Sequence, residues 1–447
     1  MKDFTQGGIM NRIVLFSVPM LIGNLFQQMY NLADAMIVGQ FVGGKALAAV
    51  GSAGIFLGFL IALLMGLCTG ASVVVSQFFG ARQERQLKRT ISTTLLFLVS
   101  LAVLLSAIGY VCMPLFLGML RVPDDVFDDT LIYLRILMFG VVFLMLFNLY
   151  DSLLRALGDS RTALYCLIFS VMLNLVLDYL FVAVLHWGVA GAAYATVASM
   201  FMCIIPCYAY ISRKIPLLKL GRPVFDRCLF RVILRYSIPA ALQLSLVNFA
   251  SLTIMRLVNT FGSSVSAGYS AALRLEQIAL MPANSISMAS ASFVGQNIGA
   301  GLEQRARRAL RATMVFMVCL SLVLSAVLLL FGQGLLSLFL RSSDANYVAI
   351  LTAGTDYLRI IALFYCLHST LFAFNGFFRG VGDAVIVMVL TVTSLTIRSL
   401  GAYAMVYLFG MGTQAIAFSI PIGWFTTSLI GWIYYARGRW RGKSVVG

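Results

Sequence analysis

Residues 91–113 read ISTTLLFLVSLAVLLSAIGYVCM and contain no charged side chain. A helix of about 20 mainly apolar residues spans the hydrocarbon core of a bilayer. Stretches of this kind recur along the whole chain, and polar connections separate them. The sequence therefore predicts an all-α integral membrane protein with twelve transmembrane helices. The expected spans are 13–38, 50–78, 91–113, 131–154, 163–185, 189–211, 233–259, 266–297, 311–332, 354–378, 385–409 and 413–436.

The composition supports the same fold class. Of the 447 residues, 61% are hydrophobic and 11% are charged, and the mean hydropathy is +0.96. A soluble domain carries about 45–50% apolar and about 25% charged residues. A membrane β-barrel would instead show segments of about 10 residues with alternating polarity, so this class is excluded.

The net charge of +16 follows the expected topology and does not indicate a surface for nucleic acid. Of the basic residues in the connections or at the adjoining span ends, 24 lie at the termini or around connections after even-numbered spans, and only Lys45, Arg121 and Arg341 follow odd-numbered spans. Cytoplasmic segments of membrane proteins collect Lys and Arg. We therefore expect a multi-pass protein of the plasma (inner) membrane with both termini in the cytoplasm, and no nucleic-acid partner.

Four short motifs of the first half recur in the same order in the second half. The distances between the partners are 220, 219, 224 and 224 residues. An ordered series of this kind indicates that the two halves are related. The pairs are Ser17-Val18-Pro19 with Ser237-Ile238-Pro239, Gln77-Phe78-Phe79-Gly80-Ala81 with Gln296-Asn297-Ile298-Gly299-Ala300, Tyr133-Leu134-Arg135-Ile136 with Tyr357-Leu358-Arg359-Ile360, and Arg155-Ala156-Leu157-Gly158-Asp159 with Arg379-Gly380-Val381-Gly382-Asp383.

The repeat predicts the domain organisation. We expect an N-terminal lobe of six helices at 1–211, a basic cytoplasmic linker at 212–232 and a C-terminal lobe of six helices at 233–447. Six spans in each half make the repeat parallel, with a pseudo-two-fold axis along the membrane normal. Parallel repeats characterise secondary transporters, whose halves rock about a substrate site near the middle of the membrane, so the lobes are expected to surround a central cavity.

Several classes of chemistry lack support in the sequence. No G-x-x-x-x-G-K-[ST] loop is present, so the chain cannot hydrolyse ATP on its own and uphill transport would need an ion gradient. The eight cysteines include no CxxC pair, and we interpret them as buried, reduced side chains. We expect neither enzymatic activity nor a cofactor.

The first candidate site lies in the first span. Asn24, Gln27, Asn31 and Asp34 are spaced at i, i+3, i+7 and i+10, which places them on one helical face. A carboxylate at the centre of a bilayer costs about 2.5–3.5 kcal/mol, so this face is expected to look into a cavity. The three amides are candidate substrate contacts. The alternative is that Asp34 lies near the end of the span and is simply hydrated.

A second acid, Asp178, follows Asn174 by one helical turn. Thr196 of the next span could reach both across a short connection. Carboxylate, amide and hydroxyl oxygens suit either a hard cation such as Na⁺ or a shared proton. The alternative is a hydrogen-bonded cluster that only holds the helices together.

The second half lacks acids at the matching positions, so ion coupling is expected in the first half. Arg274 and Glu276 are two residues apart and cannot face each other on a helix, so each needs another partner. Pro19, Pro239 and Pro282 fall inside predicted spans, where a proline permits a kink.

Two segments resemble the multidrug and toxic compound extrusion (MATE) transporters. The first runs from Pro19 to Asp34 and reads PMLIGNLFQQMYNLAD, and the second runs from Leu275 through Pro282 to Ala300. The loop at 155–159 fits as well, and the resemblance covers essentially the whole chain. It implies two six-helix lobes around a V-shaped cavity, and efflux by antiport against H⁺ or Na⁺.

The resemblance also implies roles for single residues. Asp34 matches the acid of the family's first helix, and Asn174 with Asp178 resembles the fifth-helix pair of its DinF-like bacterial and archaeal branch. Thr196 fits the sixth-helix hydroxyl of that site, and Asn148 fits its fourth-helix amide. Acids of the seventh and tenth helices matter in the other bacterial branch, but no seventh-helix acid is found here.

We therefore expect a secondary active exporter with a role in antibiotic resistance. Its partners would be the lipid bilayer and small amphipathic compounds, mostly cationic, exchanged for H⁺ or for Na⁺ bound at Asp34, Asn174 and Asp178. A monomer is expected. The alternatives are a flippase for lipids or lipid-linked oligosaccharides, which should have a strongly cationic cavity, and a channel or scaffold without coupling.

Overall fold

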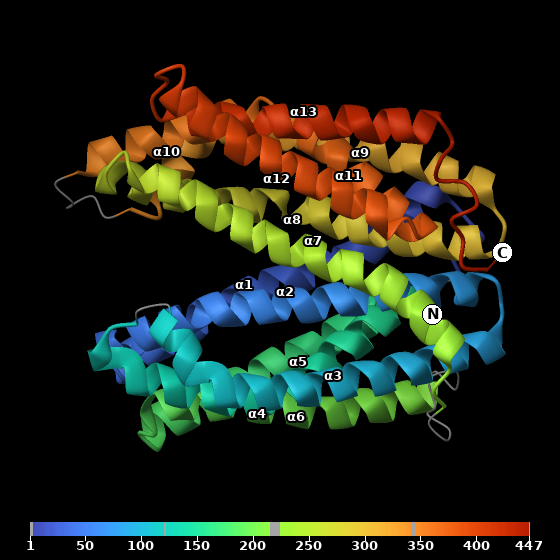
Figure 1. Ribbon diagram of the computed structural model, residues 1–447, viewed down its shortest axis with the longest axis horizontal. Helices are drawn as coiled ribbons and strands as arrows, with labels where there is room; N and C mark the ends of the chain where they lie inside the picture. The colour runs from blue at the N-terminus through green and yellow to red at the C-terminus, as the bar shows by residue number, and fades with distance from the viewer. Residues whose placement is uncertain (1–2, 120–121, 215–223, 341–345, 447) are drawn as a thin grey trace. The chain divides into compact units, whose positions relative to one another are not determined.

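The computed structural model describes residues 3–119, 122–214, 224–340 and 346–446, and the regular elements within them are helices (Figure 1). Residues 215–223 of the predicted linker lie outside this part, as do Arg121 and Arg341. The first-half helices are α1 (Ile9–Phe41), α2 (Gly44–Gly80), α3 (Glu84–Met119), α4 (Asp124–Ala156), α5 (Ser160–Asp178), the π-helix η1 (Tyr179–Val184) and α6 (Gly188–Lys214). The second-half helices are α7 (Arg227–Asn259), α8 (Ser263–Gly299), α9 (Glu303–Ser337), α10 (Tyr347–Ala362), α11 (Tyr365–Val381), α12 (Ala384–Tyr407) and α13 (Gln414–Ala436).

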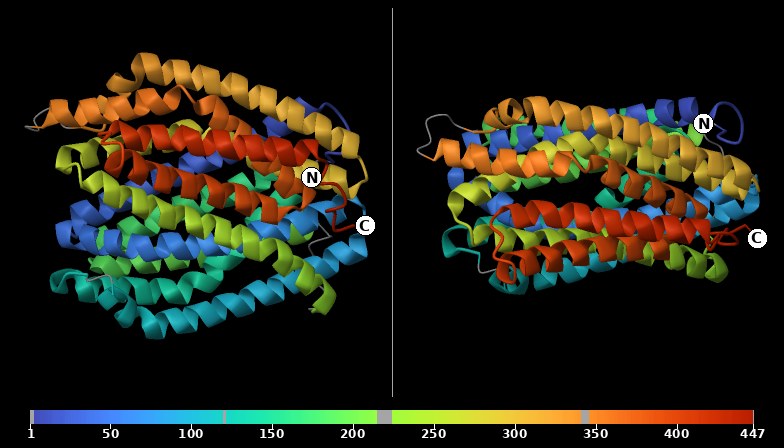
Figure 2. Two further views of the ribbon diagram at one scale, coloured as in Figure 1. Left: turned by 45° about the horizontal axis from the view of Figure 1, so that its top comes forward. Right: turned by 90° about the horizontal axis from the view of Figure 1, so that it is seen from above.

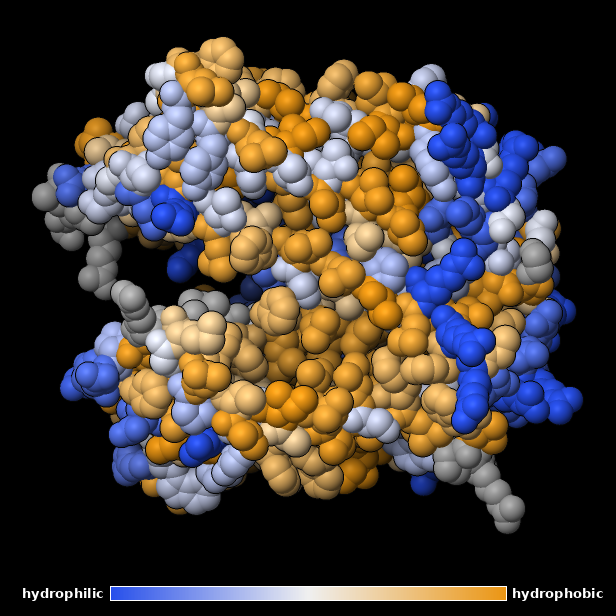
Figure 3. Space-filling view, in the orientation of Figure 1, coloured by the Kyte–Doolittle hydropathy of each residue, from blue (hydrophilic) through white to orange (hydrophobic). Residues whose placement is uncertain are grey.

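The helices match the predicted membrane spans. In the described part, eleven are long and apolar enough to cross a membrane, and α10 with α11 forms a bent pair that makes a twelfth. Large apolar side chains remain exposed on the helix surfaces, for example Phe139 with 75% and Leu330 with 76% of their area. In Figure 3, hydrophobic residues cover the middle of each helical bundle and hydrophilic residues gather near helix ends. The predicted all-α fold with twelve membrane spans is confirmed.

The tenth span differs from its prediction as a single helix over 354–378. Two helices separated by Leu363 and Phe364 replace it, and their axes meet at 58°. The Ser325 hydroxyl of α9 donates to the Ala362 carbonyl at the break, with an O···O distance of 2.5 Å. This bond links α9 to the last turn of α10, directly before the break.

The chain divides into two compact units. The first unit contains residues 18–241, and the second contains residues 3–17 and 242–447. Both α1 and α7 therefore contribute to both units. The chain passes between units at Ser17–Val18 and at Ala241–Leu242, close to the repeated prolines Pro19 and Pro239.

Each unit uses the same internal packing. In the first unit, α4 contacts α2, α3 and α6, and α5 packs on α6 (Figures 1 and 2). In the second unit, α10 and α11 take the place of α4 and contact α8, α9 and α13, while α12 packs on α13. The contacts therefore repeat in the order that the related sequence motifs predict.

One repeated motif ends a helix and starts the next. Gly158 and Gly382 have φ angles of 80° and 96°, a left-handed conformation that glycine adopts without a steric penalty. The aspartate that follows caps the next helix: Asp159 accepts from the backbone N–H of Thr162, and Asp383 accepts from that of Ile386. The sequence Gly-Asp thus forms the same turn in both halves.

Replacing Asp383 by alanine is expected to destabilise the protein. Besides the helix cap, this carboxylate accepts a hydrogen bond of 2.5 Å from the Tyr434 hydroxyl and lies 4.0 Å from Lys443 Nζ. Loss of the cap alone costs about 1 kcal/mol, and loss of the contacts with Tyr434 and Lys443 adds to it. Thermal unfolding of the purified protein should show a lower Tm for Asp383→Ala than for Asp383→Asn, because asparagine can still cap. Equal Tm values for both variants and the wild type would contradict this explanation.

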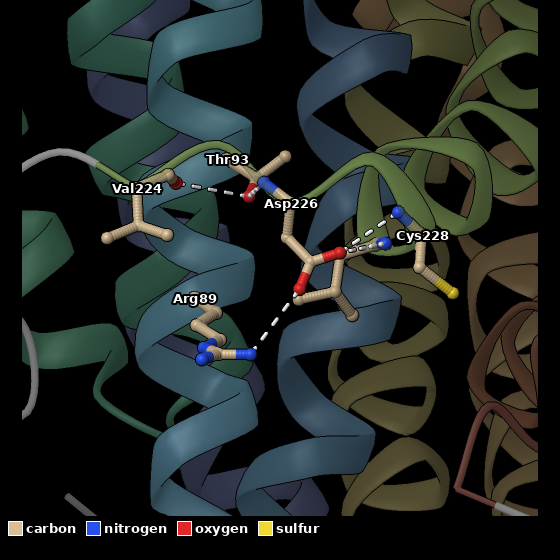
Figure 4. A network of polar contacts seen from close by, with 6 residues as sticks. Arg89, Thr93, Val224, Asp226 and Cys228 are labelled. Atoms are coloured by element: carbon tan, nitrogen blue, oxygen red, sulfur yellow. Dashed lines mark hydrogen bonds and ion pairs between the residues drawn. The ribbon is translucent and has the colours of Figure 1, made fainter.

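The first turn of α7 is anchored to α3 within the first unit (Figure 4). Asp226 accepts a hydrogen bond from the Cys228 N–H and lies 3.6 Å from the Arg89 guanidinium. The Asp226 N–H donates to the Thr93 hydroxyl, which in turn donates to the Val224 carbonyl. These contacts fix where α7 begins.

Two glycines allow α2 to touch the backbone of α7 in the same unit. A Cβ atom on Gly66 would lie 2.3 Å from Ala241 Cα, and one on Gly70 would lie 2.3 Å from Ser237 Cα. The Ser237 hydroxyl donates to the Leu67 carbonyl at 2.9 Å. Small residues four apart on both helices are the usual means of close helix packing in membranes.

Candidate functional site in the first unit

A cavity of about 650 Å³ lies among α1, α2, α4, α5 and α6 of the first unit. The polar face predicted for the first span lines it, with Asn24, Gln27, Asn31 and Asp34 all on its wall. Pro19 also lines this cavity. Helical spacing therefore brings the four polar side chains to one chamber, as the sequence predicts.

The two predicted acids meet at this site. Asp178 is fully buried, and its carboxyl lies within hydrogen-bonding reach of the Asp34 carboxyl. Among the described residues, no donor reaches either oxygen of Asp178 or Oδ1 of Asp34. Two ionised carboxyls so close together repel each other, and a shared proton or a cation relieves that repulsion. Positive charge at this pair is therefore electrostatically favoured.

Two tyrosines surround the acid pair, and sequence reasoning missed both. Tyr30 lies beside Asp34, Asp178 and Thr196, and Tyr133 faces the same two acids. Both also line the cavity. Tyr30 precedes Asp34 by one helical turn, so helical spacing could have identified it. Tyr133 belongs to the repeated Tyr-Leu-Arg-Ile motif, which in the sequence indicates only the repeat.

The predicted amide and hydroxyl partners of Asp178 lie in the same region. Asn174 is buried and lines the cavity, and both polar atoms of its amide lack a partner among the described residues. Thr196 also lines the cavity and lies next to Tyr30, while its hydroxyl donates to the Ala192 carbonyl at 3.0 Å. The Asn174 amide is therefore free to form a polar contact in this region, and Thr196 is linked to the acids by way of Tyr30.

Asn148 lines the cavity without joining the acid pair. Its amide donates to the Leu144 carbonyl of its own helix at 2.8 Å, and no contact with Asp34 is found among the described residues. One turn further on, Asp151 and Arg155 form an ion pair that also lines the chamber. The sequence places Arg155 in a loop, whereas the structure has it in the last turn of α4.

The backbone changes form directly after Asp178. There α5 gives way to the π-helix η1 over Tyr179–Val184. Short π-helical segments occur frequently at functional sites. The other two predicted kink residues, Pro239 and Pro282, lie inside α7 and α8 and do not line this cavity, and their role as kinks stays a prediction.

The chain is similar to known membrane transporters over nearly its whole length. The MatE family profile matches residues 19–180 and 239–404, which lie in the two related halves. The probable multidrug resistance protein YpnP of Bacillus subtilis is 31% identical over 443 residues, covering 98% of this chain and 97% of that protein. The FAD transporter of Shewanella oneidensis is 27% identical, covering 92% of this chain and 91% of its own.

Solved structures share the fold. A MOP superfamily transporter from Pyrococcus furiosus superposes with a TM-score of 0.90 at 24% identity, covering 98% of this chain and 97% of its own. Members of the matched family are multi-pass membrane transporters and not enzymes, and several relatives are named as multidrug resistance or export proteins. With a family profile and a relative above 30% identity both spanning its two halves, the chain belongs to the MatE family of multidrug and toxic compound extrusion transporters.

Proposed function

We propose that this chain is a secondary active exporter that exchanges H⁺ or Na⁺ for small amphipathic organic compounds, mostly cations. The proposal rests above all on two neighbouring acids: the half-buried Asp34 on the wall of a drug-sized cavity, and the fully buried Asp178 beside it. Small-molecule sites occupy about 300–1,000 Å³, and this cavity of about 650 Å³ falls within that range.

The charges in the cavity wall support organic cations as the proposed substrate class. Its described lining contains the acids Asp34 and Asp151, and Arg155 is paired with the second of them. The rest of the lining is mainly apolar, with the amides of α1 interspersed. An organic cation with an apolar body gains from both properties. A flippase for anionic lipids would need a surplus of basic groups.

The acid pair couples ion entry to substrate release by competition. While Asp34 and Asp178 share negative charge, they attract a cationic drug. Once a proton or Na⁺ from outside neutralises them, that attraction is lost and the cavity favours release. A potential of 100 mV supplies about 2.3 kcal/mol per charge, equivalent to about a 50-fold concentration ratio.

Membrane orientation follows from the distribution of basic residues. We place the protein in the plasma (inner) membrane with both termini in the cytoplasm. We further propose that it acts as a monomer. The coupling ion enters from the opposite side. The same oxygens would serve either ion: Asp34, Asn174 and Asp178 would ligate Na⁺, or the acids would share one proton.

Proteoliposomes distinguish the two ions and test the proposal. A pH gradient and a Na⁺ gradient would be imposed in separate experiments, and ethidium export should accelerate with the gradient of the coupling ion. A protonophore should abolish acceleration by a pH gradient but not acceleration by a Na⁺ gradient. Asp128→Asn, which removes an exposed acid of α4, is the matched control and should behave as the wild type. Ethidium movement that responds to neither gradient would contradict antiport and make lipid flipping the next assay.

Replacing Tyr30 by phenylalanine is expected to weaken ion coupling without stopping transport. Its hydroxyl lies beside both acids and Thr196, and one such polar contact is worth about 1 kcal/mol. The ion concentration for half-maximal export should therefore rise about fivefold. Tyr165→Phe, at an exposed position of α5, serves as the control. An unchanged ion dependence for Tyr30→Phe would remove Tyr30 from the site.

A further inference from the structure

The second unit contains a buried cluster of ionisable side chains outside the cavity described above. The Tyr357 hydroxyl of α10 donates to Glu276 Oε2 of α8 at 2.9 Å. Arg398 of α12 donates to the Tyr269 hydroxyl at 3.1 Å, and the two tyrosine rings meet edge to face at 4.9 Å. Glu276 and both tyrosines are buried. This network supplies the partner that the sequence requires for Glu276.

The cluster occupies the place in the second unit that the acid pair occupies in the first. Tyr357 follows Tyr133 by 224 residues, and Arg398 follows Asn174 by the same 224 residues. In the first unit, Tyr133 faces the acids, and Asn174 stands one turn before Asp178 on α5. The same two positions of the repeat therefore border a buried carboxylate in both units.

The carboxylate itself comes from a different helix. Glu276 lies on α8, and the matching residue 219 positions earlier is Leu57 of α2, which lines the first-unit cavity. Conversely, the position that matches Asp178 holds Ala402. A comparison of the two halves residue by residue therefore finds no second acid, although the fold brings one to the equivalent place.

An irregularity in helical structure accompanies the acid in each unit. The first unit has the π-helix after Asp178, and the second has the break between α10 and α11, which begins six residues after Tyr357. The Ser325–Ala362 bond at this break has a repeat mate in the bond from Ser106 to the Met138 carbonyl. Discontinuous helices surround the ion and substrate sites of many transporters.

A narrow cavity reaches the cluster from the helix ends. It has a volume of about 20 Å³ and is lined by Tyr269, Tyr357 and Asp356, together with the adjoining ends of α7, α8 and α13. One water needs about 10–15 Å³, so the space admits a water molecule and excludes an organic substrate. These helix ends adjoin connections that come after odd-numbered spans, and such connections are predicted to lie on the outer side of the membrane.

We propose that Glu276 is a second proton-coupling site, which exchanges its proton with the outer side past Tyr269 and Tyr357. This inference rests on the proposed antiport function and extends it to the second unit. A proton from the outer solution, relayed by water in the narrow cavity, converts the Glu276 carboxylate to the neutral acid, and the relaying water is left unchanged. Arg398 then keeps a positive charge that Glu276 no longer balances. Release of the proton restores the balance.

The surrounding charges favour a proton over Na⁺. Among the described residues, the ionisable groups that act on Glu276 are Tyr269 from α8, Tyr357 from α10, Tyr365 from α11 and Arg398 from α12. A fixed guanidinium repels a metal cation, and the nearby oxygens are too few to replace its hydration shell. The helix α9, which also packs on α8, contributes no charge to Glu276 in the part of the chain that is described.

Infrared difference spectroscopy across a pH step tests this proposal on the full-length protein in nanodiscs. We expect a buried carboxyl signal that titrates in the wild type, persists in the double variant Asp34→Asn/Asp178→Asn, and disappears when Glu276→Gln is added. Glutamine can still accept the Tyr357 hydrogen bond, so the network should stay folded, and thermal unfolding verifies this. Tyr403→Phe, which removes another hydroxyl hydrogen bond within the second unit, is the matched control and should leave the signal unchanged.

A second variant keeps the test decisive if Glu276→Gln does not fold. Tyr357→Phe retains the acid but removes its hydrogen bond, and about 1 kcal/mol corresponds to a shift of about 0.7 pH unit in the titration midpoint. A carboxyl signal that neither variant alters would overturn the proposal and leave the network a structural one. Because the spectra need no transport, they report on Glu276 even where antiport itself fails, and antiport can hold where Glu276 does not titrate.

Discussion

Replacing Asp34 or Asp178 by asparagine is expected to abolish ion-driven drug export. Each variant keeps the size and most of the polarity of the side chain but removes one of the two charges that a proton or Na⁺ would neutralise. An ion that crosses a potential of 100 mV supplies about 2.3 kcal/mol of free energy per charge. Without the carboxylate charge, this free energy can no longer drive substrate export. Ethidium export from energised proteoliposomes should fall at least tenfold, to the rate measured without a gradient.

Loss of folding is the competing explanation for such a result. Because neither Oδ of Asp178 receives a hydrogen bond from the described residues, neutral asparagine should leave the protein at least as stable as the wild type. Expression level and Tm therefore separate the two explanations. Normal export by both variants at normal Tm would mean that the acid pair is a structural feature of the first unit.

Replacing Gly70 by leucine is expected to prevent correct packing of α7 on α2. The new Cβ would lie 2.3 Å from the Cα atom of Ser237, so the two backbones must separate. Overpacking of a core costs about 1–3 kcal/mol even where side chains can adjust, and a backbone cannot adjust locally. The variant should aggregate or elute heterogeneously in size-exclusion chromatography.

The matched control is Gly51→Leu on the same helix, where a Cβ meets nothing within 4 Å. This variant should elute and unfold as the wild type does. Wild-type behaviour of Gly70→Leu would show that the close approach of α2 and α7 is not required for the fold.

The membrane spans and the polar face of α1 could be predicted because they depend on local sequence. Apolar stretches of sufficient length specify the spans, and a period of 3.6 residues places Asn24 and Asp34 on one side of α1. The repeated Gly-Asp motif likewise specifies its own turn, since glycine adopts a positive φ and aspartate caps a helix. Each of these features needs only neighbouring residues.

The break between α10 and α11 could not be predicted in the same way. No proline or glycine occurs between 355 and 375, so the sequence contains no local signal for a bend. The serine contact does not decide it either: Ser106 makes the equivalent bond to α4, which continues as one helix. Around the break, α10 and α11 pack against α8, α9 and α13, and these long-range contacts are not visible in the local sequence.

The residues of the two candidate sites also differ in how far the sequence predicts them. The polar positions in two spans predict two separate candidate sites, at Asp34 and at Asp178, and the family resemblance implies that the two acids act together. The network of Glu276, Tyr357 and Arg398 joins three helices that are far apart in the sequence. Spacing indicates that Glu276 needs a partner, but only the tertiary fold identifies it.

Substrate-driven ion movement tests the antiport mechanism most directly. Proteoliposomes without any imposed gradient would contain DNA to report ethidium entry, together with either a trapped pH-sensitive dye or ²²Na⁺. When ethidium is added outside, the wild type should move it inward and expel protons or Na⁺ in return, and Asp34→Asn/Asp178→Asn should expel neither. Ethidium entry through the wild type without any outward movement of H⁺ or Na⁺ would contradict the exchange mechanism.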